Sequence, residues 1–225
     1  MSIAPAYKPR AIVFDVDKTL TPVTVWYELD RQLKADPAAH ADAYIAYRDG
    51  SLSFKQAKES LFKIWRAHYN AITRQLLQNI FLSIEPKGSA VATIRALQQK
   101  GYHICLISAS IEMYVQLTAE RLGVEDAYGN SKFIFDEHDN WVDFEYDRDE
   151  AGLKVKQLQH FIDKHGYQLT DCVAVGDGES DLELFRVIPG VAVEAESDHL
   201  KQLAWQDIHY ITKLEQLIES LPDRA

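Results

Sequence analysis

Short apolar segments that alternate with helical patterns constrain the fold of this chain more than any other feature of its sequence. Four segments are continuous in apolar residues, as expected of strands buried on both faces of a parallel sheet. The alternation predicts an α/β fold whose core is a doubly wound (Rossmann-like), mostly parallel sheet. The apolar segments are residues 10–15, 102–108, 171–177 and 190–194, and the helical patterns are residues 88–100, 111–122, 150–165 and 180–187.

Residues 22–86 interrupt this alternation, because no segment within them is typical of a parallel strand. Ser53 is suited to the N-cap of one helix there, and an apolar stripe at helical spacing follows it. We therefore expect an all-helical cap domain at 22–86, inserted into a core domain formed by residues 1–21 and 87–225. The helical patterns of the insertion are residues 23–34, 38–48, 53–69 and 72–84.

Residues 132–146 interrupt the alternation a second time. Two runs in which apolar and polar residues alternate flank the polar sequence DEHDN. Such a pair of alternating runs around a polar turn predicts a β-hairpin.

Composition excludes several classes of protein. The chain of 225 residues carries a formal net charge of -10, so it lacks the concentrated positive charge with which proteins bind nucleic acids. Its two cysteines, Cys105 and Cys172, lie in apolar runs and are expected to be small buried hydrophobic residues. No run is long enough to span a membrane, and residues 1–10 lack the apolar core of a signal peptide. We expect a soluble, cytoplasmic protein; the sequence gives no indication of oligomeric state.

Polar residues that suit phosphate and metal chemistry follow the ends of three predicted strands. Asp15 and Asp17 follow the first strand, and Ser108 follows the second. Asp177 follows the third, and Lys154 lies near the start of a helix between the second and third strands. Open α/β sheets bind ligands at the carboxyl ends of their strands. Two carboxylates at such a position are costly to bury without a partner, and a divalent cation would compensate them.

These residues resemble the motifs of the haloacid-dehalogenase-like superfamily, in particular the phosphatases of its phosphoserine phosphatase branch. The first motif of the family is Asp-x-Asp-x-Thr, and Asp15, Asp17 and Thr19 match it. The second motif of the family is a serine or threonine at a strand end, and the third is a lysine. Ser108 and Lys154 match these two motifs, and Gly176, Asp177, Gly178 and Asp181 match the fourth, Gly-Asp-Gly-x-x-Asp.

The resemblance implies a Mg²⁺-dependent hydrolase of a small phosphorylated metabolite. Asp15 would attack phosphorus and form an aspartyl-phosphate, and Asp17 would act as general acid and base. Asp15, the backbone carbonyl of Asp17 and Asp177 would bind Mg²⁺, and Asp181 would orient these ligands. The expected phosphate-binding residues are Asp15, Val16, Asp17, Ser108, Ala109 and Lys154.

Three alternatives bear on this interpretation. Lys156 could replace Lys154, but side chains two residues apart on a helix diverge, and the spacing of the family favours Lys154. The sequence Asp-Lys-Thr that starts at Asp17 resembles the phosphorylated loop of ion-pumping ATPases, which the lack of membrane spans excludes here. A non-catalytic phosphate-binding protein on this fold is disfavoured because the acidic residues and the lysine are all present.

The substrate stays open between phosphoserine and another small phosphomonoester, such as an amino-alcohol or sugar phosphate. Phosphoserine-specific members of the family use a glutamate shortly after the first motif and an arginine in the cap. This chain has Thr24 and Leu61 near those positions. We expect the cap to close over the site and to select the substrate. The candidate specificity residues are Trp26, Tyr27, Glu28, Lys58 and Arg66.

Overall fold

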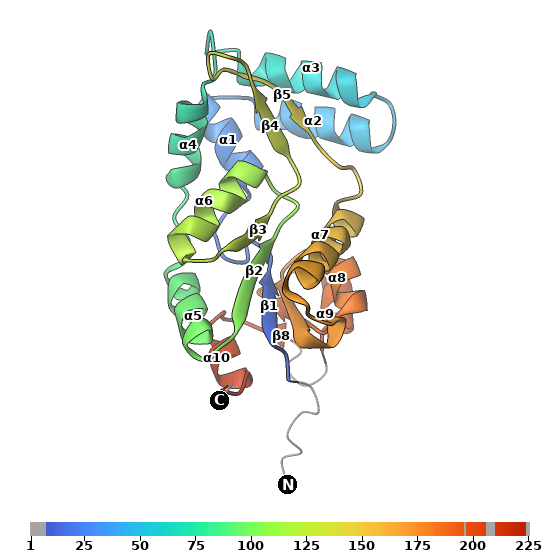
Figure 1. Cartoon of the computed structure of the whole chain (residues 1–225). Helices are drawn as coiled ribbons and strands as arrows, with labels where there is room; N and C mark the ends of the chain where they lie inside the picture. The colour runs from blue at the N-terminus through green and yellow to red at the C-terminus, as the bar shows by residue number, and fades with distance from the viewer. Residues whose placement is uncertain (1–7, 196, 206–209, 224–225) are drawn as a thin grey trace.

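A six-stranded parallel sheet forms the centre of the molecule (Figure 1). The computed structural model describes residues 8–195, 197–205 and 210–223. The strand order is β3-β2-β1-β6-β7-β8, so the chain crosses from one side of β1 to the other, as the doubly wound prediction requires. The strands are β1 (Ala11–Phe14), β2 (His103–Ile107), β3 (Asp126–Tyr128), β6 (Cys172–Gly176), β7 (Gly190–Val193) and β8 (Tyr210–Ile211).

Helices cover both faces of the sheet because its strands are apolar on both sides. Ile12 and Phe14 of β1 belong to one buried cluster, whereas Ala11 and Val13 belong to another on the opposite face. Both cysteines are buried, as the sequence predicts. Helices α5 (Gly88–Gln99), α6 (Glu112–Leu122) and α10 (Gln216–Ser220) flank the first face, and α7 (Glu150–His165), α8 (Leu182–Val187) and α9 (Asp198–Leu203) flank the second (Figure 1).

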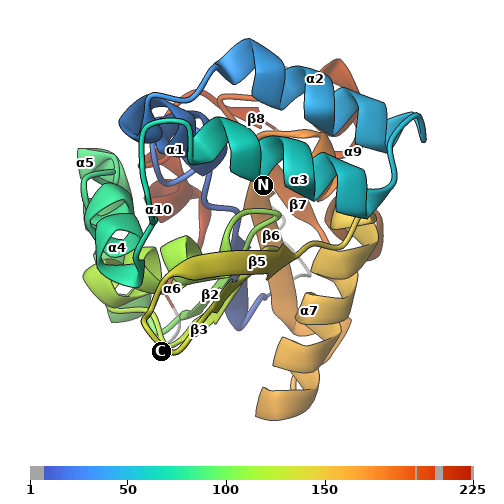
Figure 2. The same cartoon turned by 90° about the horizontal axis from the view of Figure 1, so that it is seen from above.

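Four helices within residues 22–86 lie beyond the carboxyl ends of the strands, and α2 and α3 cross this end of the molecule (Figures 1 and 2). The Ser53 side chain caps α3 in a reciprocal arrangement with Gln56, as its residue type predicts. All four predicted helical patterns are confirmed as helices, although the division into a core and a cap domain stays a prediction. They are α1 (Val25–Leu33), α2 (Pro37–Arg48), α3 (Phe54–Trp65) and α4 (Arg74–Leu82).

The predicted hairpin forms a separate antiparallel pair, β4 (Lys132–Phe135) and β5 (Trp141–Glu145). Its aromatic side chains pack against the helices of the insertion. The Trp141 ring lies 4.8 Å from the rings of both Phe62 and Trp65. The hairpin therefore shares an aromatic core with α3, although more than 60 residues separate the two segments in sequence.

The structure also contains short elements that the sequence patterns do not indicate. Strands β3 and β8 at the two edges of the sheet have three and two residues. The predicted helix at 180–187 is divided into a 3₁₀ turn at Glu179–Asp181 and the helix α8. Among the helices in the described part of the chain, none is both long and apolar enough to cross a lipid bilayer.

Candidate active site

The register of the central strands brings the motif residues to one edge of the sheet. Phe14 of β1 is level with Leu106 of β2 and Val175 of β6. The residues that follow each strand therefore emerge side by side. Asp15 extends β1 by donating its backbone N–H to the Val175 carbonyl at 2.9 Å.

Lys154 links two of the carboxylates. Its side chain is fully buried, and Nζ donates hydrogen bonds at 2.7 Å to Oδ1 of Asp15 and to Oδ1 of Asp181. Burial alone would lower the pKa of Lys154, but the negative charges of Asp15 and Asp181 outweigh this effect and raise it. The ammonium group therefore keeps its charge within the site.

Lys156 points elsewhere, as helical geometry predicts. Its side chain is 68% exposed, and Nζ lies 3.8 Å from Asp147. The prediction that Lys154 is the lysine directed inward is therefore confirmed.

The carboxylates of Asp15, Asp177 and Asp181 converge, with one oxygen of each within 4.8 Å of the others. Burial, together with the charge of Asp15, raises the pKa of Asp177 to about 6, and burial also raises the pKa of Asp181. Lys154 offsets one of these three negative charges, so the carboxylates still repel one another unless a further cation lies among them, and hard oxygen ligands suit Mg²⁺. The residues present thus fit a magnesium ion. The contribution expected of the Asp17 carbonyl stays a prediction.

Asp17 lies beside these carboxylates in a different environment. Its carboxyl group accepts hydrogen bonds from Ser110 Oγ at 3.0 Å and from the Val25 backbone N–H at 3.2 Å. Burial and the neighbouring charge of Asp15 raise the pKa of Asp17 to about 8. Ser110 was not among the predicted site residues, although it lies two positions after Ser108 in the same loop.

Gly176 leaves room for the Asp181 carboxylate. A Cβ atom at Gly176 would lie 2.3 Å from Asp181 Oδ2, closer than any non-bonded contact allows. At Gly178 a Cβ atom would meet nothing within 4 Å. Space therefore requires the first glycine of the Gly-Asp-Gly motif and does not require the second.

Gly176→Ala is expected to displace Asp181 and so to disturb both the metal ligands and the partner of Lys154. Overpacking of this kind lowers the free energy of unfolding by about 1–3 kcal/mol. Gly178→Ala is the matched control and should change it by no more than about 0.5 kcal/mol. Urea unfolding of the two variants measures the difference, and equal stability would contradict this account of Gly176.

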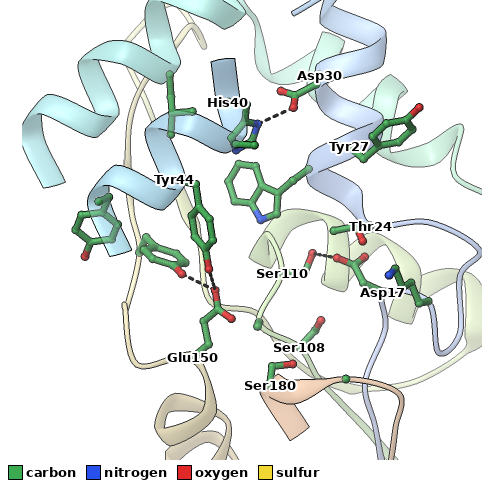
Figure 3. A pocket seen from close by; sticks show the side chains of 18 of the residues that line it. Asp17, Thr24, Tyr27, Asp30, His40, Tyr44, Ser108, Ser110, Glu150 and Ser180 are labelled. Carbon is green, nitrogen blue, oxygen red and sulfur yellow. Dashed lines mark hydrogen bonds and ion pairs between the residues drawn. The ribbon is translucent and has the colours of Figure 1, made fainter. Parts of the chain in front are cut away.

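A cavity of about 530 Å³ lies between the motif residues and the insertion (Figure 3). Asp17, Ser108 and Ser110 lie on one side of it, and Tyr44 and His40 of α2 lie on another (Figure 3). From the core, the predicted residues Asp15, Asp17, Ser108, Ala109 and Asp177 line the cavity, and from α1 the predicted specificity residues Trp26 and Tyr27 line it.

Glu28, Lys58 and Arg66 are not among the residues that line this cavity. Glu28 accepts hydrogen bonds from Arg31 and Gln32 on its own helix, both at 2.8 Å. Lys58 pairs with Asp143 and donates to the Phe144 carbonyl at 3.2 Å. Arg66 donates to the Trp141 carbonyl. The two basic residues thus join α3 to the hairpin, and the role of all three residues in specificity stays a prediction.

The chain belongs to the haloacid dehalogenase-like hydrolases, because the model of that family matches residues 12–186. Within the family it lies on the phosphoserine-phosphatase-like branch. It is 27% identical over 197 residues to a phosphoserine phosphatase of Archaeoglobus fulgidus, a match that covers 87% of this chain and 55% of that protein. It is 25% identical over 179 residues to one of Methanocaldococcus jannaschii, covering 80% of this chain and 82% of that protein.

Solved structures show the same fold. An HAD family hydrolase from Salmonella enterica serovar Typhi has a TM-score of 0.78 at 17% identity, covering 99% of this chain and 74% of that one. A substrate-bound phosphoserine phosphatase has a TM-score of 0.70 at 25% identity, covering 95% of this chain and 99% of that one.

Proposed function

We propose that this chain hydrolyses a small phosphomonoester through an aspartyl-phosphate formed on Asp15. The observation that carries the proposal is the environment of the Asp15 carboxylate. Lys154 Nζ holds it at 2.7 Å, and it converges with Asp177 and Asp181. A nucleophile, a fixed positive charge and a set of metal ligands are the groups that phosphoryl transfer requires.

In the first half of the reaction, an oxygen of Asp15 attacks phosphorus, and the bond between phosphorus and the ester oxygen breaks. Asp17 gives its proton to the departing alkoxide, so that the product leaves as a neutral alcohol. Lys154 Nζ, the Ser108 hydroxyl and the backbone N–H groups at Val16, Asp17 and Ala109 hold the phosphate oxygens. Mg²⁺, when bound by the carboxylates, supplies positive charge that offsets the negative charge of the phosphate.

In the second half, Asp17 removes a proton from a water molecule, and the water oxygen attacks phosphorus of the aspartyl-phosphate. The acyl phosphate bond breaks, which releases inorganic phosphate and restores the Asp15 carboxylate. The carboxyl group of Asp17 thus alternates between acid and base. Its hydrogen bonds to Ser110 and Val25 keep it directed at the cavity throughout.

The relatives on this branch are named phosphoserine phosphatases, and this supports a small phosphorylated metabolite as the substrate. A different small phosphomonoester is the alternative. Both substrate alternatives require phosphatase activity. Release of phosphate from p-nitrophenyl phosphate tests for that activity. The release should require Mg²⁺ and stop in excess EDTA, whereas a non-catalytic phosphate-binding protein would release none.

The metal assignment makes its own prediction. Asp177→Ala should weaken Mg²⁺ binding, measured by titration calorimetry, and should lower phosphate release because a ligand is lost. Ca²⁺ should inhibit the wild type, since its longer bonds and higher coordination number alter the geometry of the site. Asp198→Ala removes a carboxylate that is 90% exposed and is the control. Unchanged Mg²⁺ affinity in Asp177→Ala would refute the assignment.

A further inference from the structure

Aromatic side chains form most of the wall that faces the catalytic groups across the cavity. They come from α1, α2, α3, the hairpin and the segment that follows it: Trp26, Tyr44, Tyr47, Phe54, Phe144 and Tyr146. The faces of aromatic rings carry partial negative charge, so they attract cations and repel anions. The wall is therefore suited to a substrate group that is apolar, cationic or both.

A carboxylate lies within this aromatic wall. Glu150 is the first residue of α7, and its Oε1 accepts hydrogen bonds from Tyr44 at 3.2 Å and from Tyr146 (Figure 3). The two hydroxyl groups come from α2 and from the segment after the hairpin, so Glu150 fixes both rings. A carboxylate framed by tyrosine rings combines the two features that bind an organic ammonium group.

Fixed positive charge is scarce at this wall. Lys18 is the one lysine or arginine that lines the cavity within the described part of the chain, and it lies in the segment after β1 that also carries Asp15 and Asp17. Arg48 and Arg148 lie over the Tyr44 and Tyr47 rings, at 5.9 and 5.6 Å from the ring centroids, but neither lines the cavity. Each donates a hydrogen bond to the backbone carbonyl of the other. His40 lines the cavity with its Nδ1 2.6 Å from the Asp30 carboxylate. Apart from Lys18, which lies at the phosphate end of the cavity, a substrate carboxylate would find no lysine or arginine side chain among the described residues of the lining.

The position of Glu150 on α7 sets the length of the substrate. Glu150 precedes Lys154 by four residues, so the two side chains lie on the same face of the helix. Four residues rise by about 6 Å along a helix axis. Lys154 Nζ contacts Asp15, so the backbone of Glu150 lies about one helical turn from that of the lysine that holds the attacking group. A cationic group a few bonds away from the phosphate of the substrate would reach the Glu150 carboxylate.

We infer that this cavity accepts a phosphomonoester whose alcohol carries an alkylated ammonium group. The phosphate lies at Asp15, and the ammonium group lies against the tyrosine rings and Glu150. The inference rests on the proposed phosphatase activity and adds the class of substrate. It also disfavours phosphoserine, whose carboxylate would face the aromatic rings and Glu150.

Two probe substrates of equal shape isolate the effect of the charge. Phosphocholine carries a trimethylammonium group, and dimethylbutyl phosphate carries a neutral tert-butyl group in its place. We expect kcat/KM for phosphocholine to exceed that for dimethylbutyl phosphate by about tenfold, and phosphoserine to be a poorer substrate than phosphocholine. A ratio near one, or a preference for phosphoserine, would overturn the inference.

A pair of variants assigns the preference to Glu150. Glu150→Gln keeps the size of the side chain and removes its charge, so the ratio between the two probes should fall by about threefold or more, and the aromatic rings account for the preference that is left. Glu145→Gln, on the exposed edge of β5, is the matched control and should keep the ratio. An unchanged ratio in Glu150→Gln would contradict the role of this carboxylate.

If the chain is not a phosphatase, the result differs from the outcomes that overturn the inferred substrate class. In that case no phosphate is released from p-nitrophenyl phosphate or from either probe. Titration calorimetry with the wild-type protein then tests the inferred cation site by comparing the affinities for the two probes. Phosphocholine should bind about tenfold more tightly than dimethylbutyl phosphate, and equal affinities would overturn the proposed cation site.

Discussion

Asp15→Asn is expected to lower phosphate release to less than about one percent of the wild-type rate, because loss of a nucleophile removes orders of magnitude of catalysis. The protein should stay folded. An asparagine side chain keeps an oxygen that can accept the hydrogen bond from Lys154 Nζ. It also removes one negative charge from a group of carboxylates that repel one another, so the free energy of unfolding without metal should not fall.

Three measurements check this expectation. Phosphate release from p-nitrophenyl phosphate reports catalysis, and urea unfolding followed by circular dichroism reports stability. Beryllofluoride should bind the wild type at Asp15 and fail to bind the variant. Asp163→Asn, an exposed residue on α7, is the control that should keep full activity. Activity above about one percent in Asp15→Asn would make covalent catalysis by this residue untenable.

Lys154→Met is expected to have the largest effect on stability. Methionine has a similar length but no charge, so the substitution leaves the buried carboxylates of Asp15 and Asp181 without their shared cation. Removal of one partner from a buried ion pair costs about 3–5 kcal/mol. For a chain of this size we expect the melting temperature to fall on the order of 10 °C. Phosphate release should also fall, because the substrate loses a positive charge.

Lys156→Met is the matched control on the same helix. Its ammonium group is exposed, and its partner Asp147 lies at 3.8 Å, so its loss should cost less than about 1 kcal/mol. Thermal unfolding of both variants, with and without Mg²⁺, measures the difference. Mg²⁺ should restore part of the stability of Lys154→Met, since the cation compensates the same carboxylates. Similar losses in the two variants would contradict the role assigned to Lys154.

Local sequence determined much of the fold. Continuous apolar runs predict the strands β1, β2, β6 and β7, because a strand buried on both faces has no polar side to alternate with. Apolar stripes predict the helices of the insertion for a similar reason. The edge strands β3 and β8 were not predicted, since segments of two or three residues are too short to show a period.

The catalytic end of the site was also accessible from sequence. Asp15, Ser108 and Asp177 each follow an apolar run directly, and parallel strands bring their carboxyl ends to one edge. Helical geometry alone separates Lys154 from Lys156, because side chains two residues apart on a helix point in different directions. Strand ends and the helical period are local properties of the sequence. Residues placed by a strand end or by a helix face can therefore be identified from the sequence.

The substrate end of the cavity depended on tertiary structure. Tyr44, Tyr146 and Glu150 meet there, although Tyr44 lies more than 100 residues from the other two. None of them belongs to a motif, and each alone resembles an ordinary surface residue. The predicted specificity residues Lys58 and Arg66 contact the hairpin, because an aromatic core joins the hairpin to α3. Local patterns were enough to identify the groups that we propose act on phosphorus, since these groups follow strand ends and a helical period. Packing between distant segments selected the side chains that line the rest of the cavity, because no local period records a long-range contact.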